Sequence, residues 1–216
     1  MSTNAPDEAR VTRLPRRLIS LFAGLALYGI SVALIVTAGL GADPWDVFHQ
    51  GVARVTGASL GQVIIAVSGL VLLLWIPLRQ RPGFGTLANA VLVGVFADLT
   101  VALIAQPREL PARVAMMLLG VALNGVATGM YIGAQFGPGP RDGLMTGLAA
   151  RGRSVRLVRT GVEVVVLAAG WLLGGTVGVG TVVYALAIGP LAQVFIPLFS
   201  PAEPPRSSPL ESAHDR

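Results

Sequence analysis

The sequence predicts an all-α integral membrane protein with about six transmembrane helices, arranged as two three-helix repeats. Three observations predict this class. Hydrophobic residues make up 53% of the chain. Charged residues make up only 12%, against about 25% in soluble domains, so lipid must be the solvent for much of the surface. The third observation is a polar string that occurs twice among the apolar stretches.

Six apolar stretches are long enough to cross a bilayer, because about 20 helical residues span its hydrocarbon core of roughly 30 Å. They are residues 18–40, 60–78, 84–105, 114–136, 155–174 and 179–199. The first stretch follows Arg16 and Arg17, but its apolar run is too long for the core of a cleaved signal peptide. We therefore interpret it as a permanent span.

The arginines predict the orientation of these spans. All 16 basic residues are arginines, and most lie at the ends of apolar stretches. With six spans and a cytoplasmic N-terminus, thirteen arginines lie inside, and only Arg54, Arg108 and Arg113 lie outside. Both termini are therefore expected in the cytoplasm. Residues 1–15 and 200–216 are polar, and we predict that both are disordered.

The string Gly-x-x-Pro-x-Asp-x-x-x-x-Gly covers residues 41–51 and recurs at residues 137–147. Around it, residues 24–54 lie over residues 120–150 without a gap. Apolar bias produces scattered matches in membrane proteins, but it does not align proline, aspartate and glycine at fixed spacing. The string therefore indicates an internal repeat.

The repeat predicts a topology. A one-residue deletion extends the match, so residues 16–111 form one repeat and residues 112–199 the other. Three spans per repeat place the start of the second repeat on the opposite side, an inverted arrangement found in many secondary transporters. If segments 44–54 and 140–150 also crossed, the copies would be parallel. Eleven helical residues reach only about 16 Å, so we interpret the segments as re-entrant or surface half-helices.

Each half-helix begins with residues that start a helix. A glycine and a proline come first, and then Asp46 or Asp142 falls where a negative charge suits the helix dipole. Asp43 can cap the first half-helix, and Gly139 takes that place in the second. One interpretation is a repeated turn with two stabilising aspartates at the membrane surface. The other is a solute site, because helix starts attract anionic groups and carboxylates bind cations or protons.

The candidate solute-binding residues are polar or aromatic side chains in or beside the apolar stretches, namely Trp45, Asp46, Asn89, Asp98, Asn124, Arg141, Asp142 and Glu163. Ionisable groups inside a bilayer are costly, which makes them functional candidates. Asp98 has no local partner and is the stronger candidate in a span. Glu163 can pair with Arg159, four residues earlier. The asparagines more often join helices by hydrogen bonds, and Arg141 can pair with Asp142.

The residue types present argue against several other functions. The chain has no cysteine, and its two histidines, His49 and His214, lie far apart, so we expect no metal site and no cofactor. It also lacks the constellations of a serine or cysteine hydrolase, so we expect no catalytic residues. A paired-aspartate enzyme would require Asp46 and Asp142 to lie within a few ångströms of each other. Because the arginines lie at helix ends, we expect the lipid bilayer as partner rather than nucleic acid.

At Gly-x-Asp-Pro-Trp-Asp-Val, at Gly-Pro-Arg-Asp-Gly-Leu and at the Gly-x-Gly-Thr turns, the chain resembles the bacterial YczE/YyaS/YitT membrane proteins, the YczE-like branch above all. The resemblance covers roughly residues 16–198. It implies a multi-pass protein of the bacterial cytoplasmic membrane, and it supplies no substrate or catalytic residue. Position 43 is aspartate where the group's pattern suggests glycine, which weakens the case for a role of Asp43 beyond capping.

We expect a small-solute transporter or permease, because a pair of broken helices in inverted repeats is what a transport site needs. A small solute or a coupling ion would then be its ligand. The alternative is a membrane scaffold or accessory subunit that modulates a partner complex, since a chain with short loops acts only through its helices and lipids. The sequence leaves a homo-oligomer open.

Overall fold

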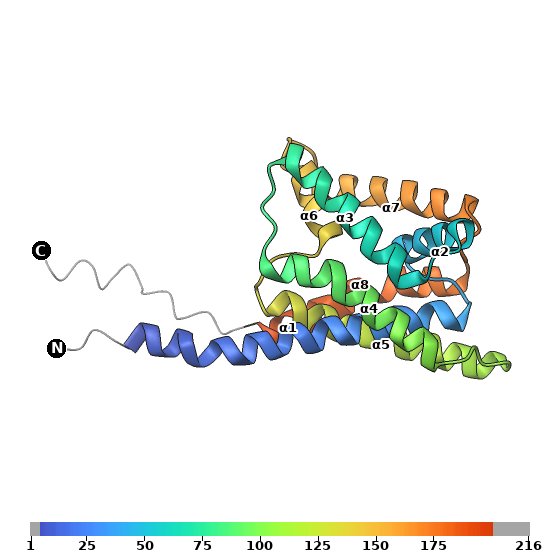
Figure 1. Ribbon diagram of the computed structural model, residues 1–216, viewed down its shortest axis with the longest axis horizontal. Helices are drawn as coiled ribbons and strands as arrows, with labels where there is room; N and C mark the ends of the chain where they lie inside the picture. Colours follow the sequence, from blue (N-terminus) through green and yellow to red (C-terminus); the bar gives the residue numbers. More distant parts are fainter. Residues whose placement is uncertain (1–4, 201–216) are drawn as a thin grey trace, which may run out of the picture.

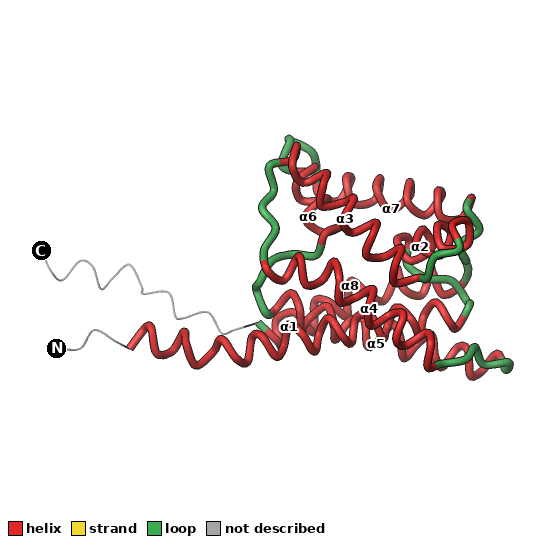
Figure 2. Tube along the Cα trace, in the orientation of Figure 1, coloured by secondary structure: helices red, strands yellow, loops and turns green. Residues whose placement is uncertain are grey.

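The computed structural model describes residues 5–200, and residues 5–13 by their backbone alone. Helices account for most of this part, and short loops join them (Figure 2). They are α1 (Ala5–Ala38), α2 (Pro44–Thr56), α3 (Leu60–Leu78), α4 (Phe84–Leu103), α5 (Leu110–Gly133), α6 (Pro140–Ala149), α7 (Val155–Leu172) and α8 (Val179–Phe199).

The helices form two layers (Figure 1). In one layer, α1 packs between α4 and α5, and α5 packs in turn against α8. The other layer contains α3 and α7 with the two short helices, and α2 packs against α7 whereas α6 packs against α3. Each short helix therefore packs against a helix from the other half of the chain.

Five helices are long and apolar enough to cross a membrane: α1 from Leu14, α3, α4, α5 and α8. The predicted six spans are thus confirmed for five. The exception is α7, because Arg156, Arg159 and Glu163 lie among its 18 residues. The boundaries also move by a few residues, since α4 ends at Leu103 and α5 already begins at Leu110.

Apolar side chains cover the outside of the candidate spans. Ile76 is 72% exposed, Leu103 is 86% exposed and Leu186 is 72% exposed. On a water-soluble monomer, such continuous apolar surface would drive association. The described helices therefore present a surface suited to lipid acyl chains.

The N-terminal segment differs from its prediction. We predict disorder for residues 1–15, but α1 begins at Ala5, so the prediction is wrong from that residue onward. Pro15 lies inside α1. The predicted disorder of residues 200–216 falls outside the described part of the chain, apart from Ser200.

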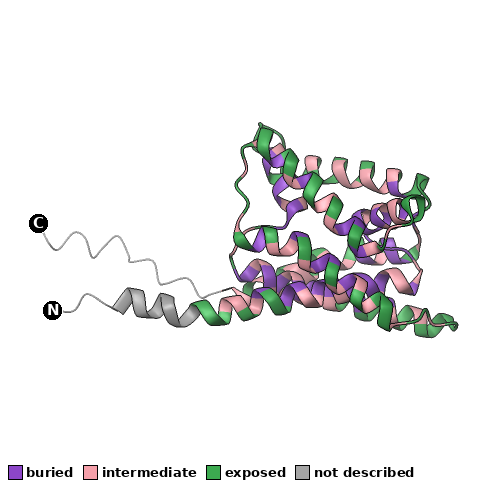
Figure 3. Cartoon of the chain, in the orientation of Figure 1, coloured by how far each residue is buried: buried purple, intermediate pink, exposed green. Residues whose placement is uncertain are grey.

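The starts of α2 and α6 are confirmed. The Asp43 carboxylate accepts a 2.6 Å hydrogen bond from the backbone N–H of Asp46, which is an N-cap contact. Gly139 precedes Pro140 and supplies no side-chain cap. Many residues of both short helices are buried (Figure 3). The two helices therefore lie among the longer helices rather than on the protein surface.

Glycines allow the spanning helices to approach closely, as is common where helices pack in lipid. A Cβ atom at Gly29 of α1 would lie 2.6 Å from the carbonyl oxygen of Val93 in α4. One at Gly125 of α5 would lie 2.6 Å from the Cβ of Leu191 in α8. A larger residue at either position would push these helices apart.

Arginine side chains cap the ends of α1 and α5. The Arg17 guanidinium donates to the carbonyl oxygens of Ala134 (3.0 Å) and Gln135 (3.2 Å) just after α5. The Arg113 guanidinium donates to the carbonyl oxygens of Ala38 (2.7 Å) and Gly39 (2.8 Å) at the end of α1. Each arginine satisfies carbonyl groups that the helix leaves unpaired and places a positive charge at the negative end of the helix dipole.

Candidate functional site

The starts of α2 and α6 meet at an ion pair inside the protein. Arg141 Nη1 donates to Asp43 Oδ2 at 2.8 Å, and the Asp43 side chain is only 6% exposed. Arg141 Nη2 also donates to the Tyr28 hydroxyl, and the guanidinium carbon lies 5.6 Å from the centre of the Tyr28 ring. The ring face favours the cation. A carboxylate, a hydroxyl and an aromatic ring therefore hold this guanidinium.

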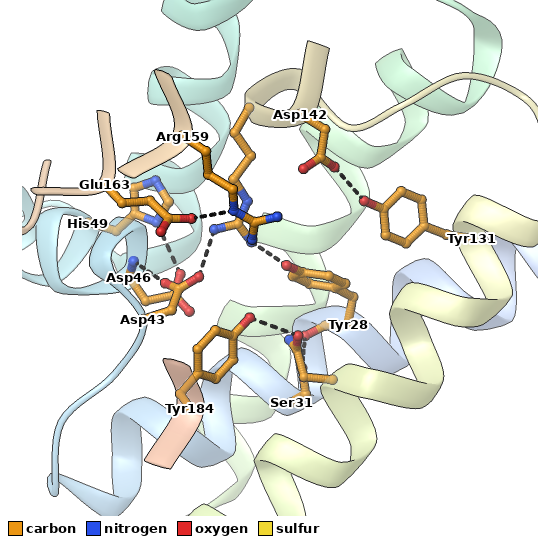
Figure 4. Close-up of polar contacts among 12 residues, drawn as sticks. Tyr28, Ser31, Asp43, Asp46, His49, Tyr131, Asp142, Arg159, Glu163 and Tyr184 are labelled. Carbon is orange, nitrogen blue, oxygen red and sulfur yellow. Dashed lines mark hydrogen bonds and ion pairs between the residues drawn. The ribbon is translucent and has the colours of Figure 1, made fainter. Parts of the chain in front are cut away.

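A second carboxylate, that of Asp46, lies in the first turn of α2 (Figure 4). The Asp46 Oδ1 atom is 3.3 Å from Nδ1 of His49, and both side chains are buried. Burial lowers the pKa of His49 to about 3, so its imidazole is neutral at pH 7. Burial also raises the pKa of Asp43 to about 6 and raises the pKa of Asp46. Both carboxyl groups thus bind protons more readily than they would in water.

Asp142 does not pair with Arg141, and that prediction is wrong. The Tyr131 hydroxyl donates to Asp142 Oδ2 at 2.8 Å (Figure 4), while Arg141 reaches Asp43 instead. Neighbouring residues on a helix point in different directions, so consecutive side chains do not face each other. Asp142 therefore contacts α5, and Arg141 contacts α1 and the start of α2.

Asn124 joins three helices, as predicted for asparagine in a span. Its Nδ2 atom donates to Ser31 Oγ of α1 at 2.8 Å, and its Oδ1 atom accepts from the Tyr184 hydroxyl of α8 at 3.0 Å. The side chain is fully buried, so each of these bonds satisfies a group that lipid cannot. Asn124 thus fixes α1, α5 and α8 beside the ion pair.

Asp98 lies away from this centre, and although it has no partner nearby in the sequence, it has partners at the start of another helix. Its Oδ1 atom accepts a 2.6 Å hydrogen bond from the backbone N–H of Gly61, and Ser59 Oγ donates to its Oδ2 atom. The carboxylate thus binds the start of α3, where a negative charge is favoured. Asp98 therefore stabilises a contact between α3 and α4.

Glu163 has the partner that the sequence predicts. Arg159 Nε donates to Glu163 Oε1 at 2.9 Å along α7. Both side chains are partly exposed, so the pair contributes little to stability. It still matters for the site, because both residues line the larger of two cavities there.

Two cavities flank the ion pair. The smaller has a volume of about 40 Å³ and is lined by Asp46 and His49 of α2, Asn89 of α4, and Ser68 and apolar residues of α3. The larger has a volume of about 390 Å³ and is lined by Arg159 and Glu163 of α7 together with residues of α5 and α8. The residues that line both are Tyr28, Trp45, Tyr131, Arg141 and Asp142.

The candidate residues therefore divide into two groups. The candidate residues that line these cavities are Trp45, Asp46, Asn89, Arg141, Asp142 and Glu163. Asn124 contacts the lining through its hydrogen bond with Tyr184, and Asp98 lies elsewhere. Within the described residues, no group of three histidine, aspartate or glutamate side chains is arranged to hold a metal ion.

Sequence reasoning missed the tyrosines and the second role of Asp43. The sequence weakened the case for a role of Asp43 beyond capping, but its carboxylate also pairs with Arg141. A signal for two tyrosines was present in the alignment of the two halves, which places Tyr28 on Asn124 and Tyr184 on Asn89. Both asparagines are candidate site residues, so the alignment indicated that the tyrosines at the matched positions were candidates too.

Together, the fold and the site define a multi-pass helical membrane protein with a polar centre enclosed by its helices. Residues 15–197 match the sequence profile of a family of unknown function (DUF6198), and the chain belongs to this family. The sequence is 42% identical to an uncharacterised protein of Haemophilus influenzae over 82% of both chains.

Two relatives from Bacillus subtilis are similar along most of their length. The uncharacterised membrane protein YczE is 34% identical over 82% of this chain and 83% of its own. The uncharacterised protein YyaS is 26% identical over 81% of this chain and 90% of its own. The resemblance to YczE and YyaS is thereby confirmed. No solved structure matches the chain.

Proposed function

We propose that this protein moves a small solute across the bacterial cell membrane, and that its two halves are inverted three-helix repeats. The observation that carries the proposal is the meeting of two short helices, one from each half, at the ion pair between Asp43 and Arg141. Broken helices that meet inside a bundle form the solute sites of many inverted-repeat transporters.

Matched contacts support the repeat. The backbone N–H of Gly85 donates to the carbonyl oxygen of Phe136 at 2.9 Å, and that of Gly180 donates to Leu40 at 2.8 Å. In the alignment of the halves, Gly85 corresponds to Gly180 and Leu40 to Phe136. Each of these two hydrogen bonds joins one half of the chain to the other. This is the arrangement expected if a two-fold rotation relates the halves.

The directions of α1 and α5 support the inversion. A Cβ atom at Gly24 of α1 would contact Met130 and Tyr131 of α5, whereas one at Gly120 of α5 would contact Ile35 of α1. Rising residue numbers along α1 therefore meet falling numbers along α5, so the two helices are antiparallel. Because they are the first helices of their repeats, the halves start on opposite membrane faces.

In this arrangement, α7 is the sixth crossing. It corresponds to α3 in the first half, and its 18 residues reach about 27 Å, close to the thickness of the hydrocarbon core. Arg159 and Glu163 neutralise each other on its surface. With six crossings, both termini lie on one side, and the arginine distribution makes that side cytoplasmic.

The polar centre is suited to a transport site. Non-helical backbone at membrane depth is tolerated only where protein or a cavity surrounds it, and the loops before Pro44 and Pro140 lead into such an interior. The same five residues line both cavities, so a solute on either side meets the same charged and aromatic groups. Relative movement of the halves would alter the contact between Asp43 and Arg141.

Solute uptake into proteoliposomes tests the proposal. We expect the purified wild-type protein to move at least one solute from a panel of amines, amino acids, sugars, carboxylates and inorganic ions. Asp46→Ala and Asp142→Ala should abolish uptake. Glu109→Ala removes an exposed carboxylate far from the cavities and should retain it. Size-exclusion profiles in detergent verify that each variant is folded.

Two outcomes would overturn the proposal. One is a folded wild-type protein that moves nothing on the panel. The other is uptake that persists in both aspartate variants. If wild type moves nothing and a stoichiometric partner copurifies in mild detergent, the protein is a scaffold or accessory subunit instead.

A further inference from the structure

We infer that the larger cavity binds a small organic ammonium cation that carries an oxygen atom, such as an amino alcohol. The inference rests on the proposed transport function and names the class of solute. It stands on the aromatic lining of the cavity, on its charge balance and on a buried donor without a partner.

The cavity has the size and the lining of a site for a small organic ligand. Its volume of about 390 Å³ lies within the usual range of ligand pockets. Aromatic side chains from four different helices line it, namely Tyr28, Trp45, Tyr131 and Tyr184. The faces of aromatic rings attract ammonium groups, and several rings around one cavity are the usual way to bind them.

The charges around the cavity leave one carboxylate in excess. Two ion pairs account for four of its five charged side chains, Asp43 with Arg141 at 2.8 Å and Arg159 with Glu163 at 2.9 Å. The fifth is Asp142. Within the described structure, its side-chain partner is the neutral hydroxyl of Tyr131.

An excess carboxylate among aromatic rings favours a cation. An anionic solute would meet this negative charge while both guanidinium groups are already occupied. Asp142 is only partly exposed, so its carboxylate loses part of its hydration, and a bound ammonium would replace some of the lost water contacts. The balance of charge therefore selects a positively charged solute.

A buried donor indicates the second feature of the ligand. Trp45 is 6% exposed and lines both cavities, and its indole N–H finds no hydrogen-bond partner among the described residues. Buried tryptophan N–H groups usually have an acceptor. Protein atoms cover this nitrogen, so a ligand hydroxyl or carboxyl oxygen would become its acceptor once the Trp45 ring turns toward the cavity. This donor is an observation independent of the charge count.

Binding to the purified full-length protein in detergent tests the inference, with choline as the probe and isothermal titration calorimetry as the readout. The control ligand is 3,3-dimethyl-1-butanol, which has the shape and hydroxyl of choline but no charge. We expect choline to bind at least about tenfold more tightly than this alcohol, because cation–π and carboxylate contacts require the charge.

Matched variants locate the site. Asp142→Asn should weaken choline binding at least about tenfold, since it removes the excess charge, while Glu109→Gln should leave binding unchanged. Ala192→Leu fills the cavity from α8 and should abolish binding. Ala66→Leu adds the same bulk to an exposed position on α3 and should not. Thermal unfolding verifies that all four variants are folded.

The possible results separate the two proposals. Equal binding of choline and its uncharged analogue, or full binding by folded Asp142→Asn or Ala192→Leu, would overturn the ammonium site. Uptake of a different solute without any choline binding would overturn it too, and transport would stand. Choline binding by a protein that moves no solute would support the site and overturn the transport function.

Discussion

Asp43 and Arg141 are 98 residues apart in the sequence, and their side chains form a 2.8 Å ion pair where two short helices begin. Each residue belongs to a different half of the chain. The Asp43 side chain is buried and that of Arg141 is largely buried, so water is a poor substitute for either partner. We expect the stability of the whole protein to depend on it.

Removal of one partner of this ion pair should lower the free energy of unfolding. Asp43→Asn or Arg141→Gln leaves the other charge buried without its counterpart, which typically costs about 3–5 kcal/mol. The double variant should lose less than the sum of the two single losses. Chemical unfolding in detergent micelles, arranged as a double-mutant cycle, measures this difference. Simple additivity would mean that the pair contributes no coupling energy.

The backbone conformation of Gln135 is strained, and substitution by glycine should relieve this strain. Its φ is 58°, in the left-handed region, and the matched residue at the end of α1 is Gly39 with φ 64°. A glycine adopts this backbone without the steric penalty of a side chain. Gln135→Gly should therefore raise the free energy of unfolding by about 1 kcal/mol. The Arg17 contact is retained, because it uses the backbone oxygen.

The measurement for Gln135→Gly is the midpoint of thermal unfolding in detergent. Gly39→Ala provides the opposite control, since it introduces a side chain at positive φ and should lower the midpoint. A lower midpoint for Gln135→Gly would contradict the strain argument and would give the Gln135 side chain a structural role.

Asp98 should matter for stability and not for ligand binding. Asp98→Asn weakens the two hydrogen bonds at the start of α3, and loss of such a cap costs about 1 kcal/mol. Choline affinity and solute uptake should remain at wild-type values, because Asp98 lies outside both cavities. If a folded Asp98→Asn protein lost solute uptake, this result would contradict the prediction and would assign Asp98 to the transport site.

The packing of α6 on α3 requires a glycine. A Cβ atom at Gly143 would overlap the Trp75 ring, whose Nε1 atom also donates to the carbonyl oxygen of Pro140 at 3.0 Å. Gly143→Ala should therefore destabilise the protein by about 1–3 kcal/mol. Trp75→Leu should remove the overlap, so the double variant should be more stable than a sum of single effects. Unfolding midpoints of all three variants check this compensation.

Local rules predict the starts of the short helices well. Pro44, Pro140 and the cap at Asp43 each act within a few residues, so their effect is readable from the sequence. The pair of Arg159 and Glu163 is likewise local, because residues four apart on a helix face each other. The five confirmed spans follow from hydropathy alone.

Contacts between distant segments escape such rules. Arg141 has a carboxylate beside it in the sequence, and only the packing of α6 directs its side chain to Asp43. Asp98 has no partner on its own helix, and its partners come from the loop before α3. The aromatic lining of the larger cavity comes from four helices, so no single stretch of sequence indicates it.

Each short helix packs against a helix of the other half, and this constrains the order of folding during synthesis and membrane insertion. A Cβ atom at Gly51 of α2 would contact Gly170 and Leu173, and Gly170 itself lies against Phe48. The inner face of α2 thus remains uncovered after its own half leaves the ribosome, until α7 has been synthesised. During that interval, the insertion machinery or lipid must shield α2, and a truncated chain that ends before α7 would present this face to the cell's quality control.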